Sequence, residues 1–341
     1  MILLVSVVLV ATALISLLLT AWMARTARGG EVLLDVPNER SSHTSPTPRG
    51  GGIVFSGLFL AAAAVCLSVS IPHRELWIAL VGGGSVVALV GWLDDWRGLP
   101  SFARLGLYAV AAAWATYWIG GLPVLSLGFV DVRFGLVGHV AAWGFILAFT
   151  NIYNFMDGID GIAASEGITV SVTAGVLLLA SGEPYVGWLL IGLAMALLGF
   201  LRWNWSPARV FMGDVGSNML GFVFATAALA MDQLSSVSVW VWAILLGVFV
   251  VDGFLTFGRR LARRLPPYKA HRSHAYQGAV QMGHSHAVVS LAIIGINIVL
   301  GGIAAMAWLC PAGAIPLLVV SYAGLAVLHM RYSPLGEERQ G

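Results

Sequence analysis

The sequence contains very few charged residues. Only 10% of its 341 residues are charged, whereas a typical soluble domain has about 25%. The 16 acidic and 18 basic side chains leave long charge-free stretches, which excludes a water-soluble globular enzyme and a disordered chain. The net charge of +2 is too small for a strong nucleic-acid binder. A polytopic membrane protein fits this composition, and we expect residues 1–341 to form one integral membrane domain.

Cysteine and lysine are also scarce. Cys66 and Cys310 lie in or beside apolar stretches, so we expect them to act as small hydrophobic residues and not as a disulfide or a metal pair. The single lysine, Lys269, follows no glycine-rich loop, which excludes a Walker-type ATP site. The first 24 residues carry no charge and lack the basic start of a cleavable signal, so a retained spanning helix is expected there.

Hydrophobic stretches of about 20 residues can cross a bilayer as helices. Open sheets would leave backbone groups unpaired in lipid, so the prediction is an all-α polytopic membrane protein with about eleven transmembrane helices. The predicted spans are 2–24, 51–71, 76–93, 102–119, 135–152, 162–181, 186–202, 214–231, 237–258, 287–309 and 314–330. Every charged residue is expected at a span end or in a loop.

The basic residues fall almost entirely on one side of these spans. Sixteen lie on one side, and only Arg74 and Arg133 lie on the other. Because basic loops stay in the cytoplasm, the N-terminus is predicted to be periplasmic and the C-terminus cytoplasmic, in the inner (plasma) membrane. The longest outer loop alternates in polarity around Gly128, between Leu125 and Arg133, which predicts a small hairpin.

Acidic residues gather in the loops of the basic side. Asp94 and Asp95 end an apolar helix, where the helix dipole disfavours anions, so a metal ion or a basic partner is expected beside them. Asn154, Asp157 and Asp160 are three residues apart and would share one face if helical. An Asx-turn that merely joins two helices is the alternative for this loop.

The next loop on this side is rich in glycine. Gly213, Asp214, Gly216 and Ser217 open a helix whose free N–H groups could bind an anion, with the acid holding a metal ion. Asp214 or Ser217 capping the helix is an equally good interpretation.

The last inner loop is basic and histidine-rich. It could bind anionic lipid headgroups, and Asp252 is expected to pair with one of its arginines. A zinc site is not expected, because no His-Glu-x-x-His motif or nearby cysteine occurs, and His284 and His286 are predicted to be interfacial.

Together these loops carry five aspartates and many cations on one membrane face. Hard oxygen ligands favour Mg²⁺, with Mn²⁺ as the alternative, and the cations favour phosphate.

Several strings, in matching order along most of the chain, closely resemble the polyprenyl-phosphate N-acetylhexosamine-1-phosphate transferase family (glycosyltransferase family 4). That family includes undecaprenyl-phosphate GlcNAc-1-phosphate transferase and phospho-MurNAc-pentapeptide transferase. The fifth loop, His271-Arg272-Ser273-His274, looks more like the O-antigen-initiating branch, which uses GlcNAc or a 6-deoxy N-acetylhexosamine. The other strings are DVPNERSSH at 35–43, the pair at 94–95, NFMDGIDG at 154–161 and FMGDVGS at 211–217.

The resemblance implies transfer of a sugar-1-phosphate from a UDP-N-acetylhexosamine to undecaprenyl phosphate, with release of UMP, at the cytoplasmic face. It implies Asp94, Asp95 and Asp157 as catalytic residues, with either Asp94 or Asp95 acting on the acceptor phosphate. It implies Asp214, with Asn154, as Mg²⁺ ligands. The implied substrate-binding residues are Arg49, Asn154, Asp160, Asn204, Phe211, His271, Arg272 and His274.

Direct attack by the acceptor phosphate is favoured over a covalent aspartyl intermediate, because that phosphate is largely ionised at neutral pH. The sequence leaves the oligomeric state open, with a homodimer as one option.

Two rival functions remain. An intramembrane prenyltransferase also combines acidic loops with magnesium, but would be expected to show two similar Asp-x-x-x-Asp motifs. A transporter would be expected to show mid-span charges and an internal repeat. The sequence shows neither pattern.

Overall fold

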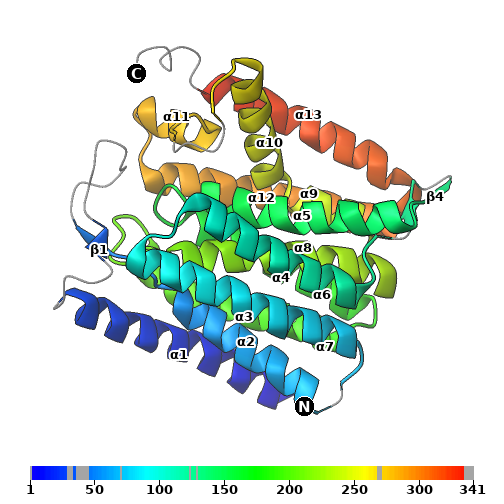
Figure 1. The fold of residues 1–341 in the computed structure, drawn as a ribbon, viewed down its shortest axis with the longest axis horizontal. Coiled ribbons are helices and arrows are strands. Elements are labelled where there is room, and N and C mark those ends of the chain that lie inside the picture. The colour runs from blue at the N-terminus through cyan, green and yellow to red at the C-terminus, as the bar shows by residue number, and fades with distance from the viewer. Residues whose placement is uncertain are drawn as a thin grey trace.

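Each predicted apolar stretch forms at least one helix in the computed structural model, which describes residues 2–28, 34–35, 46–69, 71–122, 124–127, 130–266 and 271–333 (Figure 1). The helices are α1 (Ile2–Arg28), α2 (Gly52–Ser68), α3 (Arg74–Arg97), α4 (Ser101–Ile119), α5 (Leu136–Phe155), α6 (Ile162–Ala180), α7 (Pro184–Asn204), α8 (Asp214–Leu234), α9 (Val239–Leu245), α10 (Gly247–Ala262), α11 (Ala275–Gln281), α12 (His286–Leu309) and α13 (Ala314–Tyr332), with the 3₁₀ turn η1 (Pro311–Gly313) before α13. The strands are β1 (Leu34–Asp35), β2 (Thr47–Pro48), β3 (Val124–Ser126) and β4 (Asp131–Arg133).

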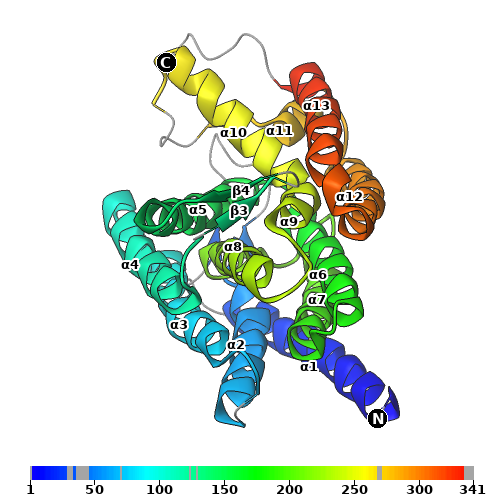
Figure 2. The same cartoon turned by 90° about the vertical axis from the view of Figure 1, so that its right-hand side faces the viewer.

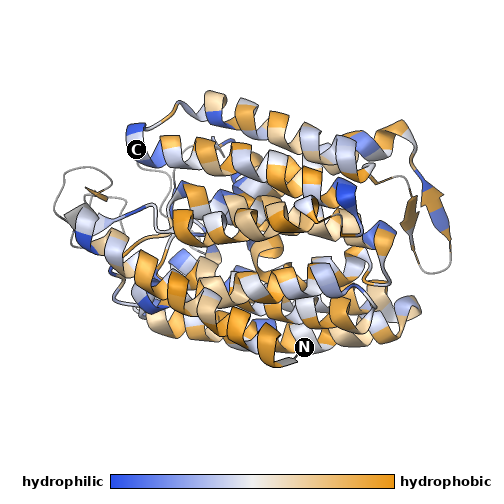
Figure 3. Ribbon diagram, turned by 90° about the horizontal axis from the view of Figure 1, so that it is seen from below, coloured by the Kyte–Doolittle hydropathy of each residue, from blue (hydrophilic) through white to orange (hydrophobic). Residues whose placement is uncertain are grey.

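The protein is therefore an all-α polytopic membrane protein. Among the described residues, eight helices are long and apolar enough to cross a membrane, and the bent pair α9–α10 would make a ninth. The predicted number of eleven is not confirmed, because neither α2, with 17 residues, nor α4 meets that test. In Figure 3, apolar residues dominate the lengths of the helices, as expected for surfaces that face lipid.

The bundle has two distinct ends. In Figure 1, α1 begins at the end that carries β4, and α13 ends at the opposite end, which also carries α11 and β1. The predicted hairpin is confirmed, since β3 and β4 pair antiparallel with Val124 opposite Arg133. Which end faces the cytoplasm stays a prediction.

Helix α8 is the centre of the bundle (Figure 2). Every residue from Val215 to Met231 is buried, mostly against α3 and α5, with α2 at its start. Glycines let the backbones approach closely. A Cβ on Gly52 would lie 2.3 Å from Gly216 Cα, and one on Gly91 would lie 2.6 Å from Val215 Cα.

The predicted continuous span at 237–258 is wrong. The chain bends by 79° between α9 and α10. In an unbroken helix the Ala243 carbonyl would accept from the Gly247 amide, but it accepts from the Tyr322 hydroxyl of α13 at 2.9 Å. A side chain inserted into the backbone ladder, next to a glycine, accounts for the break.

Gly52→Ala is expected to lower the apparent melting temperature of the detergent-solubilised protein. The added carbon would meet backbone atoms of Gly216 at 2.3 and 2.5 Å, which cannot swing aside as a side chain can. Overpacking of this kind costs about 1–3 kcal/mol. Gly57→Ala is the matched control on the same helix, where an added carbon meets nothing within 4 Å. Equal melting temperatures for the two variants would contradict the close α2–α8 contact.

Candidate active site

The five loops of the basic side meet around the start of α8. In the described chain, the first to fifth loops lie within residues 46–52, 91–100, 151–161, 202–217 and 271–286. The first loop joins the fourth through backbone bonds from Gly51 to the Phe211 carbonyl (3.0 Å) and from Gly52 to the Met212 carbonyl (2.8 Å). The fifth loop joins the third because the Tyr276 hydroxyl donates to the Phe155 carbonyl at 3.0 Å. Segments far apart in sequence therefore form one polar region at one end of the bundle (Figure 1).

Asp95 holds the first turn of α8. Its Oδ1 accepts from the Asp214 amide at 3.0 Å and its Oδ2 from the Val215 amide at 3.2 Å, and the residue is only 3% exposed. The positive end of the α8 dipole thus compensates an acid placed at the unfavourable end of α3. Neither Asp214 nor Ser217 is the cap, and these two amides bind a carboxylate of the protein where an external anion was expected.

Asp94 and Asp214 share a basic partner. Arg104 Nη1, in the first turn of α4, donates to Asp94 Oδ2 and also to Asp214 Oδ2, the latter at 2.6 Å. The expectation of a cation beside the acidic pair is therefore met by an arginine. Arg104 was not among the predicted site residues, although a lone arginine at the start of an apolar span was the available signal.

Asn154 approaches Asp214 from the other side. Its Nδ2 donates to Asp214 Oδ1 at 3.0 Å and to Ser217 Oγ at 2.9 Å. Asp94, Asp214 and Asn154 therefore lie together, and Asp214 with Asn154 as ligands of a divalent ion stays a prediction.

The donor set suits Mg²⁺ better than zinc. Two carboxylates already reach one cationic nitrogen, and magnesium in proteins commonly uses one or two carboxylates together with water and substrate phosphate. In the described part of the chain, no group of three or more His, Cys, Asp or Glu residues is arranged to hold a metal ion. The residues present fit a magnesium ion that is bound jointly with phosphate.

The third loop is a turn after Phe155, so the condition under which Asn154, Asp157 and Asp160 would share a helical face is not met. Helix α5 ends at Phe155, and the acids diverge after it. Asp160 Oδ2 accepts from the Ala208 amide at 3.1 Å and lies 3.3 Å from Nδ1 of His286, which was predicted to be merely interfacial. Burial alone would raise the pKa of Asp160, but the bonds from His286 and Ala208 hold it below its ordinary value.

Asn204 and Phe211 lie beside this turn. Asn204 is buried, accepts from the Gly161 amide at 3.1 Å and donates to the Val210 carbonyl at 2.9 Å. Its side chain therefore joins the third and fourth loops. Phe211 is half-buried, and its amide donates to the Pro48 carbonyl at 2.7 Å.

Asp157 is partly exposed, and no side-chain hydrogen bond or ion pair to it is found among the described residues. Burial, with the charges of Asp95 and Asp160, raises the pKa of Asp157 to about 7. A carboxyl group with this pKa can both hold and release a proton near neutral pH.

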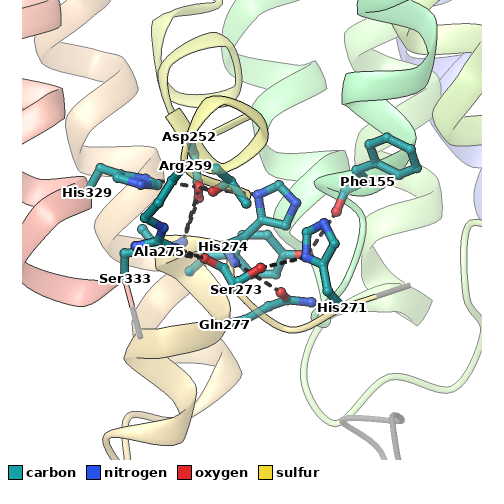
Figure 4. Close-up of polar contacts among 12 residues, drawn as sticks. Phe155, Asp252, Arg259, His271, Ser273, His274, Ala275, Gln277, His329 and Ser333 are labelled. Carbon is teal, nitrogen blue, oxygen red and sulfur yellow. Dashed lines mark hydrogen bonds and ion pairs between the residues drawn. The ribbon is translucent and has the colours of Figure 1, made fainter. Parts of the chain in front are cut away.

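The fifth loop is anchored by Asp252 of α10 (Figure 4). Asp252 Oδ1 lies 3.2 Å from Nδ1 of His274 and 3.2 Å from Nδ1 of His329 on α13, and both carboxylate oxygens accept from the Ala275 amide. The predicted pairing of Asp252 with an arginine is therefore wrong. His329 lies 77 residues from Asp252 along the chain, so no local sequence pattern indicates their contact.

His271 stacks on His274 with ring centroids 5.1 Å apart, and its Nδ1 lies 2.8 Å from Ser273 Oγ. Burial, together with His274 and Arg260, lowers the pKa of His271 to about 3, so its imidazole is neutral at physiological pH. Arg272 is partly exposed in the same loop, and its carbonyl accepts from Gln281.

Arg49 lies after β2, where its charge acts on Asp95, and its Nε is buried without a hydrogen-bond partner. Most of the string at 35–43 and Lys269 lie outside the described residues.

In sequence, residues 77–232 match the model of glycosyl transferase family 4. The chain belongs to this family of membrane transferases. It is 30% identical over 269 residues to a phospho-N-acetylmuramoyl-pentapeptide-transferase of Prochlorococcus marinus (strain MIT 9313), covering 73% of this chain and 70% of the relative.

Two further relatives act on other sugars. The identity is 28% over 331 residues to a decaprenyl-phosphate N-acetylglucosaminephosphotransferase of Mycobacterium leprae (strain TN), covering 86% of this chain and 82% of the relative. The chain is 27% identical over 270 residues to a probable undecaprenyl-phosphate N-acetylglucosaminyl 1-phosphate transferase of Bacillus subtilis (strain 168). This match covers 78% of this chain and 75% of the relative.

Asp95→Asn is expected to destabilise the protein. An amide side chain can accept with only one of its two terminal atoms, so either the Asp214 or the Val215 amide loses its partner. Leaving such a buried donor unpaired costs about 1–3 kcal/mol, which thermal unfolding in detergent would detect. Glu75→Gln, at the exposed far end of the same helix, is the control and should leave the melting temperature unchanged. An unchanged melting temperature for Asp95→Asn would rule out the capping role.

Asp157→Asn is expected to stabilise the protein above neutral pH. The pKa of Asp157 is about 7 in the folded protein, above the value of about 4 for an unfolded chain. The folded state therefore holds the proton more tightly, and this carboxyl lowers stability progressively as pH rises from about 4 to about 7. Asparagine does not ionise, so the variant does not lose stability over this pH range. Its melting temperature relative to wild type should be highest above pH 7 and should fall toward pH 5, whereas the exposed Asp131→Asn should show no such trend. A pH-independent difference would contradict the raised pKa.

Proposed function

We propose that this protein transfers an N-acetylhexosamine-1-phosphate from a UDP-sugar to undecaprenyl phosphate and releases UMP. The single observation that carries the proposal is the convergence of Asp94, Asp214, Asn154 and Arg104 at one end of a membrane bundle, where Tyr276 joins the fifth loop to the end of α5. The names of the relatives, which describe polyprenyl-phosphate sugar-phosphate transfer, support it.

The proposed reaction forms one phosphorus–oxygen bond and breaks another. An oxygen of the acceptor phosphate attacks the phosphorus that carries the sugar, and UMP leaves with the electrons of the broken bond. The acceptor is largely ionised at neutral pH, so it needs little help from a base. We favour this direct attack over a covalent aspartyl intermediate.

The main obstacle is repulsion between an anionic acceptor and an anionic donor. A magnesium ion held by Asp214 with Asn154 would screen this charge. Arg49, His271, Arg272 and His274 are proposed to bind the diphosphate or the sugar. Asp160, Asn204 and Phe211 are proposed to form the nucleotide pocket, in which Asp160 and Asn204 shape the loops through the bonds described above.

Within the acidic pair, Asp94 is the better candidate to act on the acceptor phosphate. Both oxygens of Asp95 already accept from amides of α8. Asp94 instead shares Arg104 with Asp214, the proposed metal ligand. Asp157, with its pKa of about 7, is proposed to order the reacting groups beside them.

We place the site on the cytoplasmic face of the inner membrane because the arginine-rich loops lie at this end. The product would start a lipid-linked envelope glycan such as O-antigen, as the His271–His274 string suggests. Pocket shape would decide which sugar is used.

The assay mixes purified protein, undecaprenyl phosphate, Mg²⁺ and a panel of UDP-sugars, and measures UMP. EDTA is expected to abolish UMP release. Asp214→Asn is expected to lower the rate about a hundredfold or more, because a proposed metal ligand is lost. Glu75→Gln, exposed at the other end of the bundle, should keep the wild-type rate.

UMP release that survives both EDTA and Asp214→Asn would refute the metal assignment. Release of inorganic diphosphate from a prenyl diphosphate supplied in a parallel assay, with no UMP from any UDP-sugar, would instead identify a prenyltransferase.

A further inference from the structure

Glu166 is an acidic side chain inside the membrane bundle. It lies in the second turn of α6 and is 0% exposed, so the prediction that every charged residue lies at a span end or in a loop is wrong here. Its partner is Asn297 of α12, which is 4% exposed and 131 residues away in sequence. The reaction proposed above does not use either residue.

The hydrogen bonds fix the orientation of the Asn297 amide. The Thr169 hydroxyl gives its one hydrogen to the carbonyl of Ser165 or Glu166, each at 3.0 Å, so toward Asn297 it can only accept. The atom facing it must therefore be Nδ2, at 2.9 Å. The same Nδ2 also donates to Glu166 Oε2 at 2.6 Å, so both hydrogens of the Asn297 amide take part in hydrogen bonds.

Two oxygens of this pair are then left over. Glu166 Oε1 and Asn297 Oδ1 are both buried without a hydrogen-bond partner. An ionised Glu166 carboxylate cannot form a hydrogen bond with Asn297 Oδ1, because both groups would be acceptors. Tyr153 is the titratable neighbour, but its hydroxyl donates to the Ala163 carbonyl at 2.8 Å. In the described chain no basic side chain forms an ion pair with Glu166.

We propose that Glu166 is a neutral carboxylic acid, paired with Asn297, and that this pair is a positioning device for the loop of Asp160. A proton on Glu166 turns one of its oxygens into a donor, and a donor is what the unpartnered Asn297 Oδ1 lacks. It also removes the cost of a buried unpaired charge.

The consequence for the site follows from the polar side chains of α12. His286, Ser290 and Asn297 are spaced by four and seven residues, so they share one face of that helix. Ser290 Oγ donates to the Asp160 carbonyl at 2.8 Å, and His286 Nδ1 lies 3.3 Å from Asp160 Oδ2. The Glu166–Asn297 pair therefore sets the rotation and depth of α12 against α6, and α12 holds Asp160. This step rests on the proposed function only in placing Asp160 in the nucleotide pocket.

Infrared difference spectroscopy on the full-length protein tests the protonation directly and needs no substrate. At neutral pH, wild type minus Glu166→Gln is expected to show the carbonyl band of a neutral carboxylic acid. Glu183→Gln is the matched control, because Glu183 pairs with His73 at 2.7 Å near the other end of α6 and should contribute a carboxylate band. A carboxylate band lost in Glu166→Gln would overturn the proposal.

Kinetics test the positioning role. Glu166→Gln keeps a neutral group that can donate to Asn297, so its KM for the UDP-sugar should stay within about twofold of wild type. Glu166→Leu removes every polar atom, and its KM should rise about tenfold while kcat changes less. Asn297→Leu should behave like Glu166→Leu. Size-exclusion profiles and melting temperatures select variants that remain folded.

The other outcomes are decisive as well. Loss of activity in Glu166→Gln would show that the anion is required, as for a bound cation, and would overturn the neutral pair. An unchanged KM in folded Glu166→Leu would overturn the positioning role. If wild type releases no UMP with any donor, the proposed function fails, while the infrared result still decides the state of Glu166.

Discussion

The bond between the Asp95 carboxylate and the first two amides of α8 is the constraint on which the site depends. It locks the inner end of α3 to the start of the central helix and so fixes Asp94 and Asp214 next to each other. Gly91, which admits no Cβ against Val215, allows the two backbones to come this close. Arg104 from α4 and Asn154 from α5 then reach Asp214 from opposite sides, so four helices contribute to one acidic centre. A polar region built in this way is rigid because each member is held by a different, buried element.

Around that centre the loops are held by backbone groups more than by contacts between side chains. Asn204 and Asp160 bind amides and carbonyls of neighbouring loops, and Asp252 fixes the fifth loop through the Ala275 amide. Such bonds satisfy loop backbone that would otherwise be unpaired near the membrane core. Asp157 differs from these residues, because it is partly exposed and its carboxylate has no side-chain hydrogen bond or ion pair among the described residues. Side chains that hold the loop backbone therefore lie next to side chains that do not in the same sequence strings.

The sequence predicted the helices, the hairpin and the meeting of the loops, because hydrophobic length, alternation and charge sidedness are local or cumulative signals. It did not predict contacts that depend on which helices pack together. The 79° break after α9 depends on Tyr322 of α13. The partner of Asp252 was expected within the next basic loop, but His329 comes from the last helix. The bonds from Asp95 to the first amides of α8 could not be predicted either, because a capping residue from another helix has the same sequence signature as an unpaired acid.

Arg104 has a role that extends to the protein before substrate arrives. Asp94 and Asp214 would repel each other if both were ionised and nothing lay between them, but the guanidinium bridges them and is attached to α4. The two acids can therefore lie next to each other without a soluble cation between them. A built-in counter-charge of this kind spares the fold the cost of two neighbouring buried carboxylates that lack a cation.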